Sequence, residues 1–198
     1  MVARQLRRRG IHDERVLAAM AAVPRELFLP EAERRRAYRD GAVRIGEGQT
    51  MSQPWIVACM AQLLELDGSE TVLEVGTGSG YAAAVLSLVA REVITVERYE
   101  SLAQEADRTL EQLGYRNVRV RVGDGALGAP DRAPFGGISV TATAPREPPP
   151  ALLEQLAPGA ALVCPVSRGG REYLMRFRGG AEEAVTGVRF VPLVTGEP

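Results

Sequence analysis

Short apolar runs alternate with helical patterns through the middle of the chain. The apolar runs, rich in β-branched residues, predict strands at residues 71–75, 92–97, 138–140 and 160–166, and a further strand is predicted at residues 118–122. The first run has no polar alternation and ends abruptly at glycine, which is typical of a strand buried on both faces of a parallel sheet. Helical patterns are found at residues 81–90, about 99–113 and 151–156. This order of elements predicts an α/β fold with a mostly parallel sheet.

The two ends of the chain have different patterns. Near the N-terminus one apolar helical face is formed by Val16, Leu17, Met20 and Val23. Pro24 should end this helix, and the proline-punctuated segment 23–30 is expected to pack against the later part of the chain. Towards the C-terminus, residues 173–178 and 185–190 alternate in the manner of paired antiparallel strands.

Composition excludes several kinds of chemistry. The 198 residues carry a net charge of −1, so no bulk field attracts nucleic acid or a membrane surface. All 24 basic residues are arginine, which removes a Schiff-base lysine, and His12 is the only histidine. Cys59 and Cys164 are expected to pack as small hydrophobic residues, and no metal site is expected. No apolar run reaches the roughly 18 residues of a membrane span, so we expect a cytoplasmic protein.

A glycine-rich turn follows the first predicted strand. Gly76, Gly78 and Gly80 place the third glycine one residue earlier than in a dinucleotide turn, and Glu74 precedes the first glycine by two residues. This form resembles the turn of S-adenosylmethionine-dependent methyltransferases, in which glycines let the backbone approach a cofactor that has no phosphate. The alternative is a tight turn that binds no ligand.

Two acidic residues lie where further parallel strands should end. Glu97 follows Gly76 at close to the roughly 20-residue spacing at which an acid accepts hydrogen bonds from ribose hydroxyls. Asp124, within the sequence Gly-Asp-Gly, could accept a hydrogen bond from an adenine amino group if it lies at the ligand edge of the sheet. The alternatives are a surface acid at a strand end and an ordinary turn.

The stretch from residue 45 to 55 combines two glycines, a serine and a proline. Ser52 or Gln53 could cap a helix that starts at Pro54. In the other interpretation, the glycine-rich loop and the Ser52 hydroxyl overhang the turn that contains Gly76.

Several stretches together match one family. They are Ile45-Gly-x-Gly-Gln-Thr-x-Ser-Gln-Pro54, the segment 72–81, Gly-Asp-Gly at 123–125, Ala-Pro-Phe at 133–135 and Val188-Arg-Phe-Val-Pro-Leu193. Over residues 2–196 the chain resembles protein-L-isoaspartate O-methyltransferase. The resemblance implies a class I methyltransferase fold, Rossmann-like, with a seven-stranded mostly parallel sheet and helices on both faces. A single domain is expected over residues 1–198, with a helical cap and active-site loop in 1–55 and the Rossmann-like core in 56–198.

The resemblance also implies the partners and the site. S-adenosyl-L-methionine would be the donor, S-adenosyl-L-homocysteine the product, and isoaspartyl residues in damaged proteins or peptides the acceptors. No metal, nucleic acid or membrane partner is implied, and a monomer is expected. Ser52 would be catalytic. The implied cofactor-binding residues are Thr50, Gly76, Gly78, Ser79, Gly80, Glu97, Asp124 and Gly125, and the implied substrate-binding residues are Gln53, Val191, Pro192 and Leu193.

Two positions depart from the family pattern. Gly136 and Gly137 stand where the family usually has Asp-Ala, and we expect local loosening of the strand, since each glycine weakens it by roughly 0.5–1 kcal/mol relative to alanine. Ser167 stands where a glycine usually follows the fifth strand, which puts the next turn in doubt.

The implied reaction agrees with the near absence of histidine. A carboxylate is already a nucleophile at neutral pH, so methyl transfer requires alignment and exclusion of water more than a general base. We expect Ser52 to hydrogen-bond the acceptor carboxylate and aim it at the methyl group. The alternatives are a methyltransferase of the same fold dedicated to one peptide aspartate and a non-catalytic binding module. A nicotinamide dehydrogenase is disfavoured by the glycine spacing and by the lack of a hydride-relay histidine.

Overall fold

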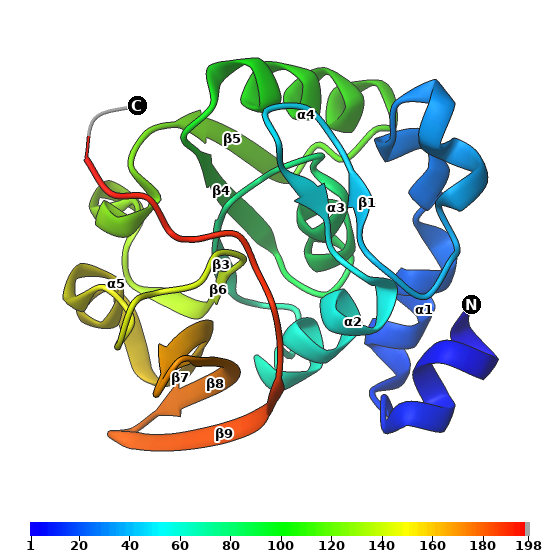
Figure 1. Ribbon diagram of the computed structural model, residues 1–198. Helices are drawn as coiled ribbons and strands as arrows, with labels where there is room; N and C mark the ends of the chain where they lie inside the picture. Colours follow the sequence, from blue (N-terminus) through cyan, green and yellow to red (C-terminus); the bar gives the residue numbers. More distant parts are fainter. Residues whose placement is uncertain (197–198) are drawn as a thin grey trace.

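The computed structural model describes residues 1–196, so the last two residues of the expected domain lie outside it. Seven strands form one sheet in the order β5-β4-β3-β6-β7-β8-β9 (Figure 1). The first five strands of this order are parallel, whereas β8 is antiparallel to β7 and β9 is antiparallel to β8. The strands are β3 (Thr71–Val75), β4 (Glu92–Glu97), β5 (Val118–Val122), β6 (Phe135–Val140), β7 (Leu156–Arg168), β8 (Arg171–Arg178) and β9 (Ala181–Gly187). The expected seven-stranded, mostly parallel sheet is therefore confirmed.

Helices and short helical turns surround this sheet. The α-helices are α1 (Glu14–Ala22), α2 (Pro54–Leu63), α3 (Tyr81–Ser87), α4 (Glu100–Gln112) and α5 (Pro150–Glu154). The shorter turns are η1 (Val2–Leu6), η2 (Arg7–Arg9), η3 (Arg25–Phe28), η4 (Glu31–Arg36), η5 (Gly125–Leu127) and η6 (Pro130–Arg132). A separate two-stranded ribbon, β1 (Val43–Arg44) and β2 (Thr50–Met51), precedes α2. Within residues 1–196, none of these helices has the length and apolarity to cross a bilayer.

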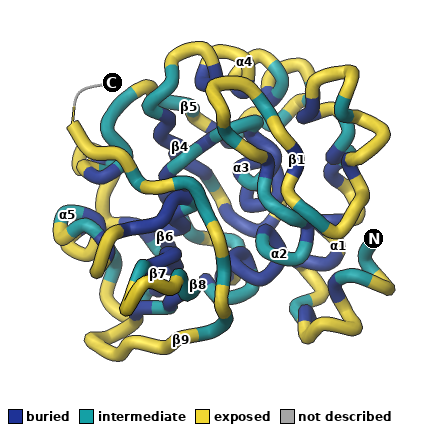
Figure 2. The backbone as a smooth tube through the Cα atoms, viewed as in Figure 1, coloured by how far each residue is buried: buried dark blue, intermediate teal, exposed yellow. Residues whose placement is uncertain are grey.

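The central strands are buried on both faces, which explains their continuous apolar pattern. All five residues of β3 are buried, and its consecutive Val72 and Leu73 belong to two different apolar clusters. The cluster with Val72 includes residues of α1, α2 and α3, and the cluster with Leu73 includes Leu152 of α5. Figure 2 shows this buried centre inside exposed loops and an exposed β9. The sheet thus has helices on both faces, with shorter ones on the α5 side.

The N-terminal segment packs against the central domain, as its apolar pattern predicted. The apolar face of α1 is buried, and the helix ends at Ala22 just before Pro24. Phe28 of η3 makes an edge-to-face contact with Tyr81, at 5.7 Å between ring centroids, and also contacts Tyr115. The first helix after the glycine turn is therefore held by an element that precedes it by about fifty residues.

The C-terminal hairpin differs from the sequence prediction. The second strand was expected at residues 185–190 but occupies Ala181–Gly187. Gly179 and Gly180 both have positive φ, +57° and +81°, so they form a two-residue hairpin turn that fixes the start of β9 at Ala181. The expected strand was wrong because the first half of β9 is exposed and shows no apolar alternation.

Gly136 and Gly137 do not interrupt their strand. β6 starts at Phe135, earlier than the predicted residue 138, and Gly137 pairs with both Val72 and Ala161. The expected loosening is limited to a register shift against β7 between Phe135 and Gly137. A Cβ on Gly136 would lie 2.5 Å from Cγ of Glu70. The carboxylate of Glu70 is held in place by hydrogen bonds that it accepts from the backbone nitrogens of residues 67 and 68. Glu70 therefore fills the space beside this glycine.

Ser167 causes no break either, because β7 continues to Arg168 and the turn follows at Gly169 and Gly170. The remaining differences are at element ends. α3 ends at Ser87, three residues before the predicted end, and α5 covers Pro150–Glu154.

Candidate active site

The candidate site lies where the strand order reverses its direction along the sheet. From β3 the chain adds β4 and β5 on one side, then returns to add β6 and β7 on the other. Ligands of open α/β sheets bind at the carboxyl ends of the strands at such a switch point. Here the turn after β3 meets the end of β6, because Thr141 N donates to the Val75 carbonyl at 2.8 Å. A cavity of about 330 Å³, the inner cavity, opens at this point.

The glycine turn forms the floor of the inner cavity. Gly76 has φ of +92°, and a Cβ there would collide with the hydroxyl oxygen of Thr141. That hydroxyl donates to the carbonyls of Val75 and Gly76, at 3.0 and 2.8 Å. A side chain at position 76 would therefore be strained and would displace the contact that joins the two strand ends. Gly76 thus lets the turn pack against Thr141, and both residues line the inner cavity.

Glu97, at the end of β4, lines the inner cavity and is itself 6% exposed. Its carboxylate accepts one hydrogen bond per oxygen, from Gly78 N at 2.8 Å and from Tyr99 N at 3.1 Å. Because a carboxylate offers roughly four acceptor positions, two remain for hydroxyl donors in the cavity. A ribose diol has two such donors, so this side chain fits the ribose of an adenosine cofactor.

A buried chain of hydroxyls supports the turn from below. Thr77, between Gly76 and Gly78, shares a 2.7 Å hydrogen bond with the Thr95 hydroxyl, which donates to Oε2 of Glu74 at 2.6 Å. Glu74 is completely buried, and its Oε1 has no hydrogen-bond partner within residues 1–196. Burial raises the pKa of Glu74 to about 8, against a lowering by the Thr95 hydrogen bond. Glu74 is therefore a neutral acid at pH 7 and belongs to the scaffold of the turn.

The ribbon β1–β2 and the residues after it cover the inner cavity as a lid. The helix α2 begins at Pro54 as predicted, but neither Ser52 nor Gln53 caps it with its side chain. The N-cap interpretation of Ser52 is thus wrong. Its backbone carbonyl accepts a hydrogen bond of 2.5 Å from Nη2 of Arg25, while its hydroxyl forms none with residues 1–196 and lines the cavity.

Arg25 is the buried link between the lid, the N-terminal segment and the glycine turn. It is 0% exposed, donates to the Ala37 carbonyl at 2.7 Å as well as to that of Ser52, and lies 4.6 Å from the ring centroid of Tyr81. Within residues 1–196 it has no carboxylate partner. Burial lowers its pKa. A buried guanidinium with two carbonyl acceptors and an aromatic face has its position fixed by all three.

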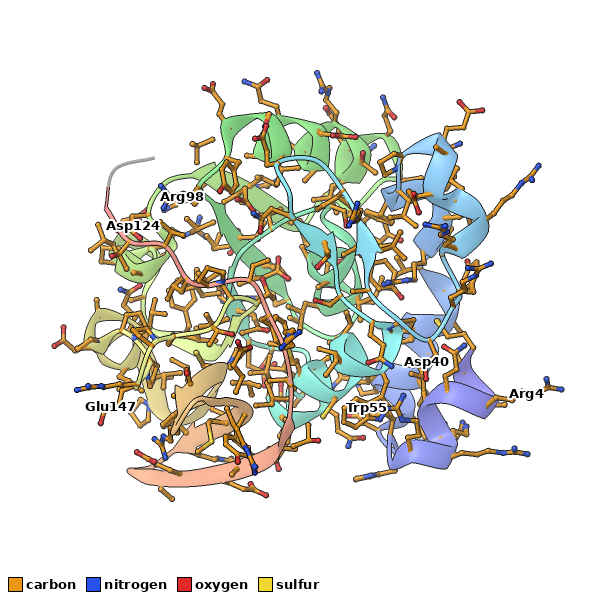
Figure 3. All side chains as sticks on the ribbon, in the orientation of Figure 1. Arg4, Asp40, Trp55, Arg98, Asp124 and Glu147 are labelled. Atoms are coloured by element: carbon orange, nitrogen blue, oxygen red, sulfur yellow. The ribbon has the colours of Figure 1, made fainter. Side chains whose placement is uncertain are left out.

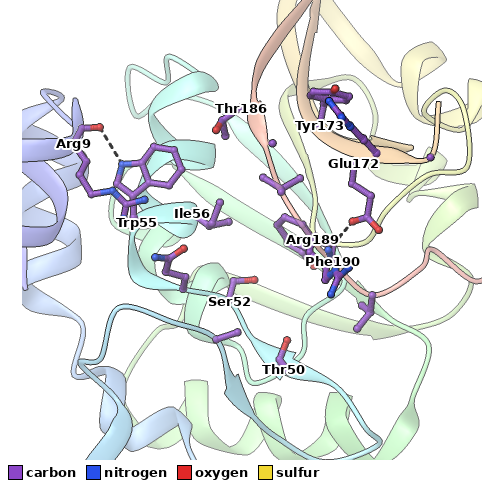
Figure 4. Close-up of a pocket in the computed structure, with 18 residues that line it drawn as sticks. Arg9, Thr50, Ser52, Trp55, Ile56, Glu172, Tyr173, Thr186, Arg189 and Phe190 are labelled. Atoms are coloured by element: carbon purple, nitrogen blue, oxygen red, sulfur yellow. Dashed lines mark hydrogen bonds between the residues drawn. The ribbon is translucent and has the colours of Figure 1, made fainter. Parts of the chain in front are cut away.

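A larger outer cavity, of about 970 Å³, adjoins the inner one. Four residues line both, namely Thr50, Ser52, Thr141 and Val191. Figure 4 shows Trp55 and Arg9 at one end of the outer cavity, Tyr173, Glu172 and Arg189 at the other, and Ser52 between them. Ser52 therefore lies at the junction of the two cavities.

The C-terminal segment crosses the carboxyl edge of the sheet and completes the inner cavity. Thr143 N donates to the Val191 carbonyl, and Leu193 N donates to the Thr143 carbonyl, both at 2.8 Å. Gly196 N donates to Oδ2 of Asp124 at 2.7 Å, and Arg98 donates to the Val194 carbonyl at 2.9 Å. Figure 3 shows Arg98 and Asp124 beside this segment. The segment is thus fixed at both ends of its crossing.

Most of the residues singled out from the sequence come together in the inner cavity. Its lining includes Thr50, Ser52, Gly76, Gly78, Ser79, Glu97, Gly125, Val191, Pro192 and Leu193. Gln53 lines the outer cavity. Gly80 is turned towards α4, where a Cβ would lie 3.2–3.3 Å from Ala106 and Leu110. Asp124 uses its two oxygens for the backbone nitrogens of Ala126 and Gly196.

Two contributors were missed in the sequence. Thr141 could have been found, because it directly follows a predicted strand and therefore lies at the ligand edge of the sheet. Arg25 could not, because its partner Ser52 is 27 residues away and nothing local in the sequence pairs them. Among residues 1–196, no three His, Cys, Asp or Glu side chains are grouped so as to hold a metal ion.

Known proteins share both the sequence and the fold. The whole chain, residues 1–198, matches the family described as protein-L-isoaspartate(D-aspartate) O-methyltransferase. Protein-L-isoaspartate O-methyltransferase 1 of Syntrophobacter fumaroxidans is 52% identical over 198 residues, which are 98% of this chain and 92% of that protein. A crystal structure of a Plasmodium falciparum protein in complex with S-adenosyl-L-homocysteine is similar with a TM-score of 0.84 and 25% identity, over 98% of this chain and 97% of that one. A structure of another protein-L-isoaspartate O-methyltransferase has a TM-score of 0.83 and 30% identity over 94% of this chain, which spans 62% of that longer one.

Proposed function

The chain belongs to the protein-L-isoaspartate(D-aspartate) O-methyltransferase family, and from this premise we propose how its two cavities divide the reaction. The enzyme transfers a methyl group from S-adenosyl-L-methionine to the α-carboxylate of isoaspartyl residues in proteins or peptides. The inner cavity holds the donor and the outer cavity holds the peptide. The observation that carries this division is that Ser52 lines both cavities.

The residues of the inner cavity fit the donor. Its volume of about 330 Å³ lies within the roughly 300–1,000 Å³ typical of small-molecule sites. Glu97 would bind the ribose hydroxyls through its remaining acceptor positions, and the bare backbone at Gly76 would receive the methionine part. The sulfonium supplies a methyl group that is already activated for displacement.

Ser52 orients the acceptor. Its hydroxyl donates to one oxygen of the isoaspartyl carboxylate and leaves the other oxygen free to attack. Arg25 fixes this hydroxyl through the Ser52 carbonyl, so the lid presents it in one position. The carboxylate oxygen forms the new C–O bond as the methyl–sulfur bond breaks, and no proton moves. The methoxy group of the resulting ester leaves more readily than an oxygen of the carboxylate. The next backbone nitrogen can therefore attack the ester carbonyl, close a succinimide and release methanol, and the succinimide hydrolyses partly to normal aspartate.

Matched peptides test the proposal. An isoaspartyl peptide should be methylated, with release of methyl ester, while its normal aspartyl twin should not. Methylation of the aspartyl peptide alone would reject isoaspartate as the acceptor and favour an enzyme dedicated to one peptide aspartate.

Replacement of the serine separates its role from donor binding. Ser52→Ala should lower kcat about ten- to a hundredfold, since it removes a hydrogen bond to a charged group, while the affinity for S-adenosyl-L-homocysteine should stay the same. Ser52→Thr keeps the hydroxyl and serves as the control. Equal kcat in Ser52→Ala and the wild type would reject the role of this hydroxyl.

The remaining expectations about the setting stay predictions from the sequence. They are a monomer and a cytoplasmic location. Light scattering of the purified enzyme at two concentrations checks the first, because a dimer would be recognised by its doubled mass.

A further inference from the structure

The outer cavity is far larger than one isoaspartyl residue needs. Its volume of about 970 Å³ is nearly three times the 330 Å³ of the inner cavity. Ser52 and Val191 mark the end at which the methyl group is transferred, because they line both cavities. The remainder of the outer cavity therefore receives the residues that flank the isoaspartate in the substrate.

The charged side chains of this remainder are mostly positive. Arg9, Arg171 and Arg189 line it, and Glu172 is the acidic lining residue. The chain as a whole has a net charge of −1, so this excess is local. A concave surface lined by one sign of charge favours ligands of the opposite sign.

The four charges are not equally available to a ligand. Oε2 of Glu172 already accepts hydrogen bonds from Phe190 N at 2.8 Å and from the Thr143 hydroxyl at 2.9 Å. Arg9 is paired with both oxygens of Asp40, and its guanidinium lies 4.5 Å from the ring centroid of Trp55. Glu172 and Arg9 are thus held by contacts within the protein and are less available to a ligand.

Arg171 and Arg189 differ from them. Both are exposed, and neither side chain forms a hydrogen bond or an ion pair with any of residues 1–196. Arg189 precedes Val191 by two residues, which is about 7 Å of extended chain. An extended peptide with its isoaspartate at Val191 would thus place a side chain about two residues away beside Arg189.

We propose that Arg171 and Arg189 form a subsite that selects isoaspartyl substrates with an acidic residue one to three positions from the isoaspartate. The proposal rests on the proposed function and adds the class of peptide that this particular chain prefers. The contact of each guanidinium with a flanking carboxylate is an ion pair open to solvent, so it is worth about two- to fivefold in kcat/KM and weakens with salt.

A peptide series tests the subsite. Each peptide carries one isoaspartate in a neutral sequence, with a single glutamate or its glutamine twin at each position from three before to three after it. At the favoured position the wild type should give a glutamate-to-glutamine ratio of kcat/KM of about two to five, mainly through KM. The double variant Arg171→Gln/Arg189→Gln should bring this ratio to about one.

Two further variants make the test specific. Arg4 and Arg108 are exposed arginines away from the outer cavity, and Figure 3 shows Arg4 at the N-terminal side of the molecule. The control Arg4→Gln/Arg108→Gln should keep the wild-type ratio. Arg189→Glu should reverse the preference, so that a lysine peptide becomes the better substrate than its glutamate counterpart.

The possible failures can be told apart. Methylation of the neutral isoaspartyl peptide with equal rates for every glutamate and glutamine pair would overturn the subsite and keep the proposed function. A preference for glutamate that survives in Arg171→Gln/Arg189→Gln would overturn the assignment to these two residues. A wild-type enzyme that methylates none of the isoaspartyl peptides would reject the proposed function and the subsite together.

Discussion

Replacing Glu74 by glutamine should abolish a loss of stability that the wild type shows as the pH rises. Burial raises the pKa of Glu74 to about 8 from an ordinary value of 4.5. Between these two pH values the folded protein holds a proton on Glu74 that the unfolded chain has released. Folding then requires uptake of a proton, so the free energy of unfolding falls as the pH increases.

The magnitude follows from the width of this window. A full proton difference changes the free energy of unfolding by about 1.4 kcal/mol per pH unit, so from pH 5 to pH 8 the loss is on the order of 4 kcal/mol. Below pH 4.5 both states are protonated and the loss disappears. Glu74→Gln keeps an oxygen that accepts from the Thr95 hydroxyl but carries no titrating group, so it should not show this loss.

Urea unfolding at pH 5, 6, 7 and 8 measures the effect. The difference in unfolding free energy between Glu74→Gln and the wild type should rise by about 1.4 kcal/mol per unit over this range. Glu105→Gln, an exposed site on α4, is the control and should give a constant difference. A Glu74→Gln difference that is the same at pH 5 and pH 8 would refute a buried neutral acid at this position.

Three further substitutions probe contacts around the site. Arg25→Lys cannot reach both carbonyls, so kcat should fall about tenfold with a loss of about 2 kcal/mol in unfolding free energy, and unchanged kcat would argue against Arg25 as the residue that positions Ser52. Glu97→Gln removes one acceptor and should weaken binding of S-adenosyl-L-homocysteine about ten- to a hundredfold in a calorimetric titration, whereas equal affinity would remove Glu97 from the ribose site. Gly136→Ala should lower the free energy of thermal unfolding by about 1–3 kcal/mol, because the added methyl group overpacks against Glu70. In the Glu70→Gly background the same substitution should cost much less, and an equal cost in both backgrounds would contradict the clash.

The central strands could be predicted from the sequence because their environment is uniform. β3 and β4 have the bounds expected from the apolar runs, since they lie inside the sheet and are buried along almost their whole length. β5 also has its expected bounds, although it is an edge strand and mostly exposed, because valine and arginine alternate along it. The position of β9 was predicted wrongly because this exposed edge strand has no apolar alternation in its first half. Its start follows from the Gly179–Gly180 turn instead. A continuous apolar run or a clear alternation thus determined which strands could be predicted.

The parts of the site also differ in how far they could be predicted from local sequence. Glu97 and Gly76 could be placed from the sequence because both follow strands and their spacing reflects one strand–helix–strand unit. The bond between Arg25 and the Ser52 carbonyl, and the one between Thr141 and Gly76, join segments 27 and 65 residues apart. No local pattern encodes such pairs, because the sequence separation depends on how the whole chain is wound.

The buried Arg25 explains why a helical segment outside the sheet belongs to the site. A guanidinium taken out of water without a carboxylate partner is unfavourable unless its donors are used and its charge is offset. Nε and Nη2 of Arg25 donate to two carbonyls and its face lies on Tyr81, while Nη1 has no hydrogen-bond partner within residues 1–196, so its burial depends on the lid, the N-terminal segment and the first helix after the glycine turn all being in place. Ser52 is consequently positioned by the folding of the N-terminal segment, and a change at Arg25, which lines neither cavity, should lower turnover.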